Sequence, residues 1–371
     1  MDTTELDSVG SVYSPRMDLP INPPIKPMLA KAVAGIPDRE DLVFEPKWDG
    51  FRCIIFRDGD DVELGSRNER PLTRYFPEMI EPIRANLPER CVVDGELIVA
   101  TNEKLDFEAL QQRIHPAESR VNMLAEATPA AFMAFDLLAI GDADLRSEPY
   151  STRRASLETA LGNPEPPIYL TRTTTDKEEA AEWFRVFEGA GLDGLIAKPV
   201  DDPYAENKRS QLKVKHVRTA DCVVAGYRWH KDGKGVGSML LGLYDEDGQL
   251  NSIGVVASFT AKRRAELVEE LAPLREAALE NHPWRDWANA AAHEDGRMPG
   301  APHRWSGQKD HNWVPLRIER VVEVKYNATL NGRLREVGRF LRWRPDKEPS
   351  QCTFDQLDEP EPTNLSFVLN G

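Results

Sequence analysis

The sequence predicts an α+β protein in which a larger part, built on antiparallel strands, is followed by a small β-barrel. In the first part, short apolar runs are interrupted by tight Asp-Gly turns and alternate with segments of helical periodicity. After residue 218 the pattern becomes almost entirely that of strands joined by hairpin turns. The chain has 371 residues, of which 40% are hydrophobic. This length suits about two domains with their own cores.

The first domain is expected to follow a loose start. Residues 1–22 are polar or proline-rich, which predicts a flexible N-terminal tail. Residues 23–217 then form the first folded domain. Its strand-like runs are 42–66 with its Asp-Gly turns, 91–100, 130–140, 193–200 and 210–217, and its helical patterns are 76–87, 105–114, 152–161 and 176–189.

The second domain is expected over residues 218–350. Five or so strands with hairpin turns suit a small closed barrel such as the OB-fold, which often binds nucleic acid. Residues 261–316 interrupt this pattern with one amphipathic helix and a loop containing Trp, His and Gly. The acidic segment 351–371 is expected to be a disordered tail.

Charge and composition exclude several classes of protein. The net charge of −15 argues against nucleic-acid binding by the whole surface, because phosphate binding needs clustered Lys and Arg. Residues 317–347 nevertheless hold nine basic residues against four acidic ones, which indicates either a basic binding face or a solvated strand face. The four cysteines form no C-x-x-C pair, which argues against a zinc site. There is no apolar run of about 18 residues, so we expect a cytoplasmic protein without a membrane span.

The segment "EPKWDGFR" at 45–52 offers a candidate nucleophile, Lys47. A lysine amine is nucleophilic only when neutral, so such a lysine needs neighbouring cations or burial to lower its pKa. "QLKVK" at 211–215 supplies cations, because Lys213 and Lys215 alternate onto one face of a strand. Taken alone, the segment is more typical of a strand that ends in an Asp-Gly turn than of a catalytic site.

Five further segments follow in a fixed order. They are "SRN" at 66–68, "DGEL" at 94–97, "FMAFDLL" at 132–138, "DGLIAK" at 193–198 and "QLKVK". Together with "KWDGFR" they resemble the covalent nucleotidyltransferase superfamily of ATP-dependent ligases and capping enzymes, whose first motif is K-x-D-G-x-R. "RWRPDK" at 342–347 is similar to the R-x-D-K motif that follows the OB barrel there. "PPIKPMLA" with "PVDDPY" is similar to the short bacterial ATP-dependent DNA ligases of the ligase C type.

The resemblance implies an antiparallel-sheet nucleotidyltransferase domain, ATP-grasp-like as in other ligases, followed by an OB-fold. It implies that Lys47 attacks the α-phosphorus of ATP and carries AMP. Lys215 and Lys213 would balance charge on the phosphate, and Lys198 would be a further nucleotide-binding residue. Phe135 would stack on adenine, although a core strand would also hold a phenylalanine there.

Other residues are assigned to ATP and metal by the same resemblance. Arg52 and Arg67 would hold the ribose and the nick phosphates, and Glu45 would fix the adenine. A surface ion pair or a solvated edge strand is the ordinary alternative for these three residues. Glu96 and Asp193 would lie near the ribose and a divalent metal, with Asp193 replacing the usual Glu and so binding metal less directly.

The R-x-D-K motif is expected to act on the leaving pyrophosphate. The residues assigned to it are Arg344, Asp346 and Lys347. In the family, the OB domain swings onto the nucleotide to complete the site.

The function implied is an ATP-dependent DNA ligase, DNA ligase (ATP), that uses ATP and Mg²⁺ or Mn²⁺. It would seal nicked or broken duplex DNA between a 3′-hydroxyl and a 5′-phosphate, through lysyl-AMP and an adenylated DNA 5′ end, in DNA repair. We expect a monomer, associated with the nucleoid, with other DNA repair proteins as further candidate partners. The alternatives are an mRNA capping guanylyltransferase, an RNA ligase, or an inactive DNA-end-binding module.

Overall fold

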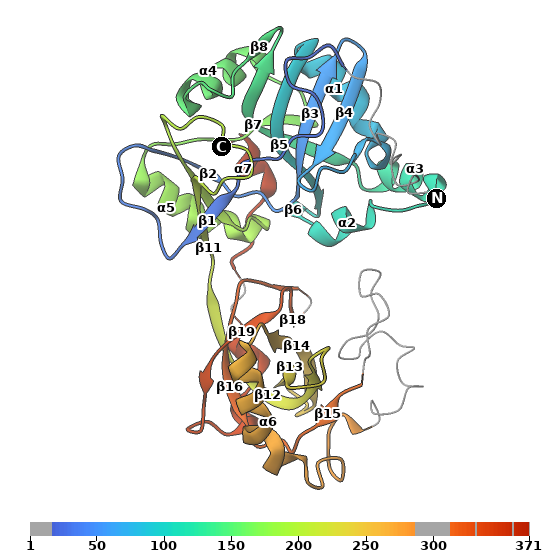
Figure 1. Cartoon of the computed structure of the whole chain (residues 1–371), viewed down its shortest axis with the longest axis vertical. Helices are drawn as coiled ribbons and strands as arrows, with labels where there is room; N and C mark the ends of the chain where they lie inside the picture. Colours follow the sequence, from blue (N-terminus) through green and yellow to red (C-terminus); the bar gives the residue numbers. More distant parts are fainter. Residues whose placement is uncertain (1–16, 286–311, 331, 358–359, 371) are drawn as a thin grey trace, which may run out of the picture. The chain divides into compact units, whose positions relative to one another are not determined.

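The computed structural model describes residues 17–285, 312–330, 332–357 and 360–370. The chain divides into two compact units (Figure 1). Unit 1 is Met1–Lys215 with Pro360–Gly371, and unit 2 is His216–Glu359. The main division therefore falls two residues before the one drawn from the sequence, and the last residues of the chain return to unit 1.

The first sheet of unit 1 has seven strands. Their order is β4-β3-β5-β7-β8, with β6 paired to β5 and β9 paired to β7. All pairs are antiparallel except β7 with β9. The strands are β3 Phe51–Asp58, β4 Asp61–Ser66, β5 Arg90–Thr101, β6 Lys104–Leu105, β7 Ala130–Ile140, β8 Ala143–Asp144 and β9 Ile168–Leu170.

The second sheet of unit 1 has four strands in the order β1-β11-β10-β2. Only β1 and β11 are parallel. The strands are β1 Ala30–Val33, β2 Leu42–Pro46, β10 Gly194–Pro199 and β11 Gln211–Lys215. The antiparallel bias predicted from the turns is therefore confirmed in both sheets.

Each of the four predicted helical segments of unit 1 contains a helix. Asp106 and Asp176 begin two of these helices by accepting hydrogen bonds from the backbone N–H groups of Ala109 and Glu178. The helices are α1 Ile80–Asn86, α2 Phe107–Gln112, α3 Glu118–Ala127, α4 Tyr150–Leu161, α5 Lys177–Val186 and α7 Leu365–Asn370, with 3₁₀ turns η1 Thr73–Tyr75, η2 Pro77–Met79 and η3 Phe187–Ala190. Sequence reasoning did not predict α3 or α7.

The prediction of a flexible tail over residues 1–22 is wrong for its last six residues. Residues 17–22 are folded, and the side chains of Met17, Leu19 and Ile21 are buried against Ile54 and Phe56 of β3. These three apolar residues alternate, so one side of an extended segment can pack on the sheet. Residues 1–16 lie outside the described part of the chain.

The acidic C-terminal segment differs most from the prediction of a disordered tail. It begins at the last residue of η7 Pro349–Gln351 and contains η8 Phe354–Gln356 and α7. The side chains of Leu365 and Val368 in α7 are buried in the core that α5 and the four-stranded sheet share. The segment before α7 lies directly against η3, because a Cβ on Gly189 would collide with the carbonyl oxygen of Glu361. The prediction of disorder was based on the acidic composition of 351–371, and the short apolar pattern of α7 was not recognised within it.

Unit 2 is a closed five-stranded barrel. Its strands pair in the order β13-β14-β19-β16-β12, and β12 pairs again with β13. Only β14 and β19 are parallel. This topology confirms the predicted OB-fold. The strands are β12 Arg218–Trp229, β13 Val236–Tyr244, β14 Leu250–Ala257, β16 Val321–Tyr326 and β19 Gly338–Trp343, with the short strands β15 Val314–Pro315, β17 Thr329–Leu330 and β18 Arg333–Leu334.

The predicted insertion 261–316 is partly described. It begins with α6 Ala261–Leu271, capped by the side chain of Thr260, and η4 Ala272–Arg275. Leu267, Leu271 and Trp284 from this segment are buried in the barrel core. Residues 286–311 lie outside the described part. Among the helices of the described ranges, none has the length and apolarity needed to cross a membrane.

Candidate active site

Lys47 lies just after β2 and is fixed by backbone pairing. Its N–H donates to the carbonyl oxygen of Gly194 at 2.9 Å, and its own carbonyl oxygen accepts from Asp193 N–H at 3.0 Å. Gly50 of the following Asp-Gly turn lies against β5, where a Cβ would collide with the carbonyl oxygen of Leu97. The glycine of "KWDGFR" is therefore required by this close approach.

The two faces of the four-stranded sheet have different chemistry. Ile196 of β10 pairs with Glu45 on one side and Lys213 on the other, so these side chains share one face. By alternation that polar face carries Val43, Glu45, Ile196, Lys198, Lys213 and Lys215. The opposite face carries core residues of unit 1, namely Leu42, Phe44, Leu195, Ala197 and Val214.

A single carboxylate oxygen holds two of the predicted lysines. Asp193 Oδ2 accepts from Lys47 Nζ at 2.5 Å and from Lys215 Nζ at 2.7 Å. Burial acts to raise the pKa of Asp193, but the two lysines outweigh it and the pKa is lowered. Asp193 is therefore an ionised counter-charge that keeps the candidate nucleophile beside Lys215.

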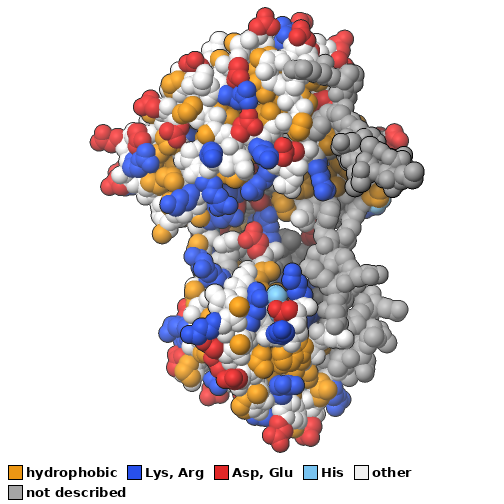
Figure 2. All heavy atoms as spheres, viewed as in Figure 1, with side chains coloured by type: hydrophobic (Ala, Val, Ile, Leu, Met, Phe, Trp, Pro, Cys, Tyr) orange, Lys and Arg blue, Asp and Glu red, His pale blue; other side chains and the backbone are white. Residues whose placement is uncertain are grey.

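Lys213 and Arg67 add positive charge to the same place. Burial first, and then the charges of Lys215 and Lys47, lower the pKa of Lys213, while Asp193 opposes this shift. The charge of Arg67, which is exposed directly after β4, acts on Lys213 in the same direction as the lysines. On the face drawn in Figure 2, Lys and Arg side chains gather on the lower part of unit 1. The structure thus brings together the cations that the sequence motifs predicted.

Glu45 and Lys198 form a buried ion pair next to this cluster. Glu45 Oε1 lies 2.8 Å from Lys198 Nζ, and both side chains are almost fully buried. Burial raises the pKa of Glu45 and lowers that of Lys198, and the charge of each partner opposes the shift of the other. Glu45 Oε2 is buried and has no hydrogen-bond partner among the described residues. An acceptor of this kind fits the exocyclic amine of adenine.

Phe135 is covered by cations in the structure. Lys198 Nζ lies 4.5 Å from the centre of its ring, and the guanidinium carbon of Arg52 lies 4.4 Å from it. The ring is 5% exposed, as a core phenylalanine would be. Its neighbours, however, are two of the predicted nucleotide-binding side chains, so it lies in the candidate site.

Arg52 is held by a carboxylate that sequence reasoning did not assign. Arg52 Nε and Nη2 donate to Asp94 Oδ1 and Oδ2 at 2.6 and 2.5 Å. Asp94 is fully buried and also accepts from Tyr204 Oη at 2.6 Å. The signals available were the Asp of "DGEL" and the Tyr of "PVDDPY", but the contact joins residues 110 positions apart.

Glu96 lies opposite Arg52 in the pairing of β3 with β5. Burial raises the pKa of Glu96 to about 7, although the charges of Arg52 and Lys47 act to lower it. The charges of Arg52 and Lys47 therefore do not offset the effect of burial on the pKa of Glu96. A divalent cation would supply the missing charge.

The two predicted metal carboxylates differ in how they fit a cation. Asp193 already binds two ammonium groups through Oδ2, whereas Glu96 keeps a raised pKa. Within the described ranges, no three His, Cys, Asp or Glu side chains lie close enough to form a metal cage. Mg²⁺ commonly takes one or two carboxylates together with phosphate oxygens and water. Glu96 fits that pattern better than Asp193.

The predicted R-x-D-K residues lie together in unit 2, directly after β19. Arg344 Nη1 donates to both oxygens of Asp221, at 2.9 and 2.7 Å, and Lys347 Nζ lies 3.1 Å from Asp221 Oδ2. Arg344 also pairs with Asp346 at 2.9 Å, and this contact contributes to lowering the pKa of Asp346 to about 2. Asp221, at the start of β12, was not found from the sequence.

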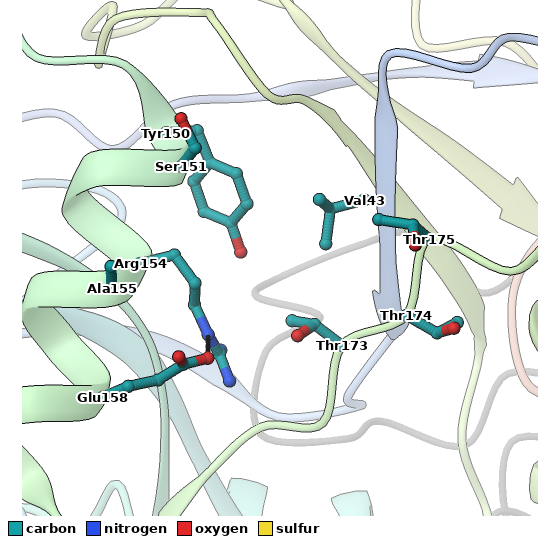
Figure 3. A pocket seen from close by; sticks show the side chains of 9 residues that line it. All are labelled: Val43, Tyr150, Ser151, Arg154, Ala155, Glu158, Thr173, Thr174 and Thr175. Atoms are coloured by element: carbon teal, nitrogen blue, oxygen red, sulfur yellow. Dashed lines mark hydrogen bonds and ion pairs between the residues drawn. The ribbon is translucent and has the colours of Figure 1, made fainter.

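A pocket of about 420 Å³ opens near Glu45, between α4 and the segment after β9 (Figure 3). Tyr150 lies between the pocket and the Glu45–Lys198 pair. Its side chain lines the pocket, and its ring centre is 4.8 Å from Lys198 Nζ. Tyr150 Oη and Arg154 Nη1 are buried and, among the described residues, have no hydrogen-bond partner. The lining residues are Val43, Tyr150, Ser151, Arg154, Ala155, Glu158, Thr173, Thr174 and Thr175.

Comparison with known families matches both units. A family described as "ATP dependent DNA ligase domain" matches residues 27–215, and one described as "ATP dependent DNA ligase C terminal region" matches residues 232–347. The chain is 55% identical over 360 residues to DNA ligase C of Mycobacterium tuberculosis, covering 96% of this chain and 99% of that protein. It is 56% identical over 346 residues to DNA ligase C2 of Mycolicibacterium smegmatis, covering 93% and 97%.

A solved structure from a study of Lig E DNA ligases has the same fold. It aligns with a TM-score of 0.54 and 20% identity, and the alignment covers 86% of this chain and 99% of that one. Within unit 1, the lysine motif and the motifs "DGEL", "FMAFDLL", "DGLIAK" and "QLKVK" are linked by side-chain contacts of Arg52, Lys198 and Asp193. The chain belongs to the ATP-dependent DNA ligase family.

Proposed function

We propose that Lys47 is the nucleophile of this ATP-dependent DNA ligase. After the ammonium loses a proton, the neutral amine attacks the α-phosphorus of ATP. The bond from Nζ to phosphorus forms as the bond to pyrophosphate breaks, and a second proton leaves Nζ. The observation that carries the proposal is the shared contact of Lys47 and Lys215 with Asp193 Oδ2. It supports a site in which Lys215, with Lys213 beside it, balances the charge that grows on the phosphate.

The later steps use the same lysyl-AMP. A DNA 5′-phosphate oxygen attacks the adenylate phosphorus and displaces Lys47, which leaves an adenylated 5′ end. A 3′-hydroxyl then attacks the DNA 5′-phosphorus, the strand is joined, and AMP leaves. We propose that Arg67 binds the 5′-phosphate, because its guanidinium is exposed at the edge of the lysine cluster.

We propose that the base and ribose lie along the polar face from Lys47. Side chains two residues apart on one face of a strand are separated by about 6.7 Å. Glu45 is two residues before Lys47, so its side chain is the next one along this face. Its unpartnered Oε2 would accept from the adenine amine, with Lys198 holding Oε1. Phe135 would stack on the base once Arg52 moves from its ring to the ribose.

ATP-dependent DNA ligases use a divalent metal, and we propose that Glu96 is its main protein ligand here. A bound Mg²⁺ or Mn²⁺ neutralises phosphate charge and orients the phosphate oxygens. Asp193 would reach the metal only through water, because its Oδ2 is shared by two lysines. Arg344, Asp346 and Lys347 are proposed to act on the leaving pyrophosphate.

The cellular role that best suits the chain is repair of breaks in chromosomal DNA. We propose that it acts as a monomer at the nucleoid and that other DNA repair proteins present its substrates. The capping guanylyltransferase, the RNA ligase and the inactive end-binding module remain the alternatives against which the activity is tested.

The test uses the full chain and ATP radiolabelled at the α-phosphate. Wild type with Mg²⁺ should form a labelled covalent adduct and seal a matched nicked duplex, while Lys47→Ala should form none. Lys31→Ala, which removes an exposed lysine of the same sheet, is the matched control and should behave as wild type. Labelling by GTP in place of ATP would indicate a capping enzyme. A labelled Lys47→Ala variant would overturn the assignment of the nucleophile.

A further inference from the structure

Asp221 has an unusual place in unit 2, because one carboxylate binds two residues of the "RPDK" turn. It receives Arg344 Nη1 on both oxygens and Lys347 Nζ on Oδ2. Its side chain is 12% exposed, so water competes little for these contacts. Asp221 lies 123 and 126 positions from these partners in the chain.

The backbone of Asp221 is fixed as well. Its N–H donates to Gln356 Oε1 at 2.7 Å, and its carbonyl oxygen accepts from Gln356 Nε2 at 3.0 Å. On the other side, β12 is paired with β16, where Asp221 lies opposite Glu323. The carboxylate therefore projects from a rigid part of the barrel and can act as a fixed anchor.

The donors of Arg344 are divided between two carboxylates. Nε and Nη2 donate to Asp346, and Nη1 donates to Asp221. A guanidinium holds its five N–H groups in one plane, so contacts on two sides fix its orientation. Lys347 Nζ has three donors, of which the contact with Asp221 uses one. Lys347 can therefore be oriented by Asp221 and still reach a phosphate.

We propose that Asp221 is a positioning residue for adenylation. By binding Arg344 and Lys347 together, it holds the "RPDK" turn in the form that acts when pyrophosphate leaves, and it takes no part in the later joining step. This inference rests on the proposed role of Arg344, Asp346 and Lys347 in the first step. The competing interpretation is that Asp221 withholds both cations from the nucleotide.

The test separates the first step from the last with the full chain. Asp221→Asn keeps the shape of the side chain but removes its charge. The rate of lysyl-AMP formation from ATP and Mg²⁺ should fall about 10- to 100-fold, as expected for the loss of hydrogen bonds to charged groups. Sealing of a nicked duplex that already carries a 5′-adenylate should be unchanged. Asp221→Glu, which restores the charge, should recover part of the adenylation rate.

Glu323→Gln is the matched control. Glu323 lies beside Asp221 on the next strand and binds Arg342, two residues before Arg344, at 2.6 Å. This variant should adenylate as wild type does, and thermal unfolding of both variants reports any loss of the barrel. The proposal is wrong if Asp221→Asn adenylates at the wild-type rate or faster, or if both steps fall together. A wild type that forms no adenylate would instead overturn the proposed function.

Discussion

The two faces of the four-stranded sheet in unit 1 come from the same strands and have opposite properties. Lys213, Val214 and Lys215 are consecutive in β11, yet the two lysines lie on the polar face and Val214 is buried in the core. Alternation along a strand is sufficient to produce this separation. Chemistry and stability can therefore be changed almost independently, by substituting neighbouring residues.

The polar face also differs in how its charges are arranged. Its cations are held by carboxylates at the edge or beneath the surface: Asp193 binds Lys47 and Lys215, and Glu45 binds Lys198. Removing one partner of a buried pair leaves the other uncompensated. The apolar face has no such constraint, because α5 and α7 cover it with hydrocarbon. At Lys47 and Lys215, however, Asp193 keeps one cation when the other is removed, so substitutions there should affect rates first.

Lys215→Ala is expected to have the largest effect. The rate of lysyl-AMP formation should fall about 10²- to 10³-fold, as when one preorganised group that stabilises a transition state is removed. The free energy of unfolding should change little, because Asp193 keeps its contact with Lys47. Single-turnover adenylation and urea unfolding measure the two effects. A variant that unfolds easily but adenylates normally would reverse the roles of the two faces.

Val214→Ala tests the other face at the adjacent residue. Val214 is 2% exposed, and removing its two methyl groups should lower the free energy of unfolding by about 2 kcal/mol. Adenylation per folded molecule should be close to that of wild type. If adenylation fell as far as in Lys215→Ala while the protein stayed folded, the two faces would be coupled through the strand.

The polar face could be predicted from the sequence to a large extent. The alternation of "QLKVK" correctly placed Lys213 and Lys215 on one face, and the backbone contact of Lys47 with Gly194 explains why "DGLIAK" adjoins "KWDGFR". These contacts depend on local periodicity and on the order of motifs. Such features can be read from a single chain.

The partners of the arginines could not be predicted in the same way. Asp94 with Arg52 joins residues 42 positions apart and Asp221 with Arg344 joins residues 123 positions apart, and no local pattern in the chain indicates either contact. The return of 360–370 to unit 1 was missed for another reason. A six-residue helix such as α7 is too short for its periodicity to be detected inside an acidic segment.

Glu96 should make adenylation on the polar face depend on pH. Burial raises its pKa from the usual 4.5 to about 7, so without metal the carboxyl is neutral below that pH. If ionised Glu96 is required to bind the metal, adenylation at a limiting Mg²⁺ concentration should fall as the pH drops below 7, and a higher Mg²⁺ concentration should restore it. Glu96→Gln should be slower but should lose this component of the pH profile. A wild-type profile identical in shape to that of Glu96→Gln would contradict the role of its charge.

The raised pKa of Glu96 should also make the folded protein less stable as the pH rises. The folded protein keeps the Glu96 proton up to a pH of about 7, whereas the unfolded chain releases it near 4.5. Ionisation therefore destabilises the fold as the pH rises through this range. Urea unfolding should show this as a difference between two pH values. The free energy of unfolding of Glu96→Gln minus that of wild type should be larger above pH 7 than at pH 4. Bound metal should reduce this advantage.

Val368→Ala in α7 is the smallest change and tests what covers the apolar face. Val368 is fully buried with Leu365 in the core beneath β2 and β10, while Ser366 between them is exposed. The free energy of unfolding should fall by about 1 kcal/mol, because a short terminal helix can relax around the lost methyl groups. Ser366→Ala is the control and should change little, and adenylation should be unaffected in both. Equal stability of Val368→Ala and wild type would mean that α7 does not cover this face in solution. The separation of the two faces would then depend on α5 and the sheet alone.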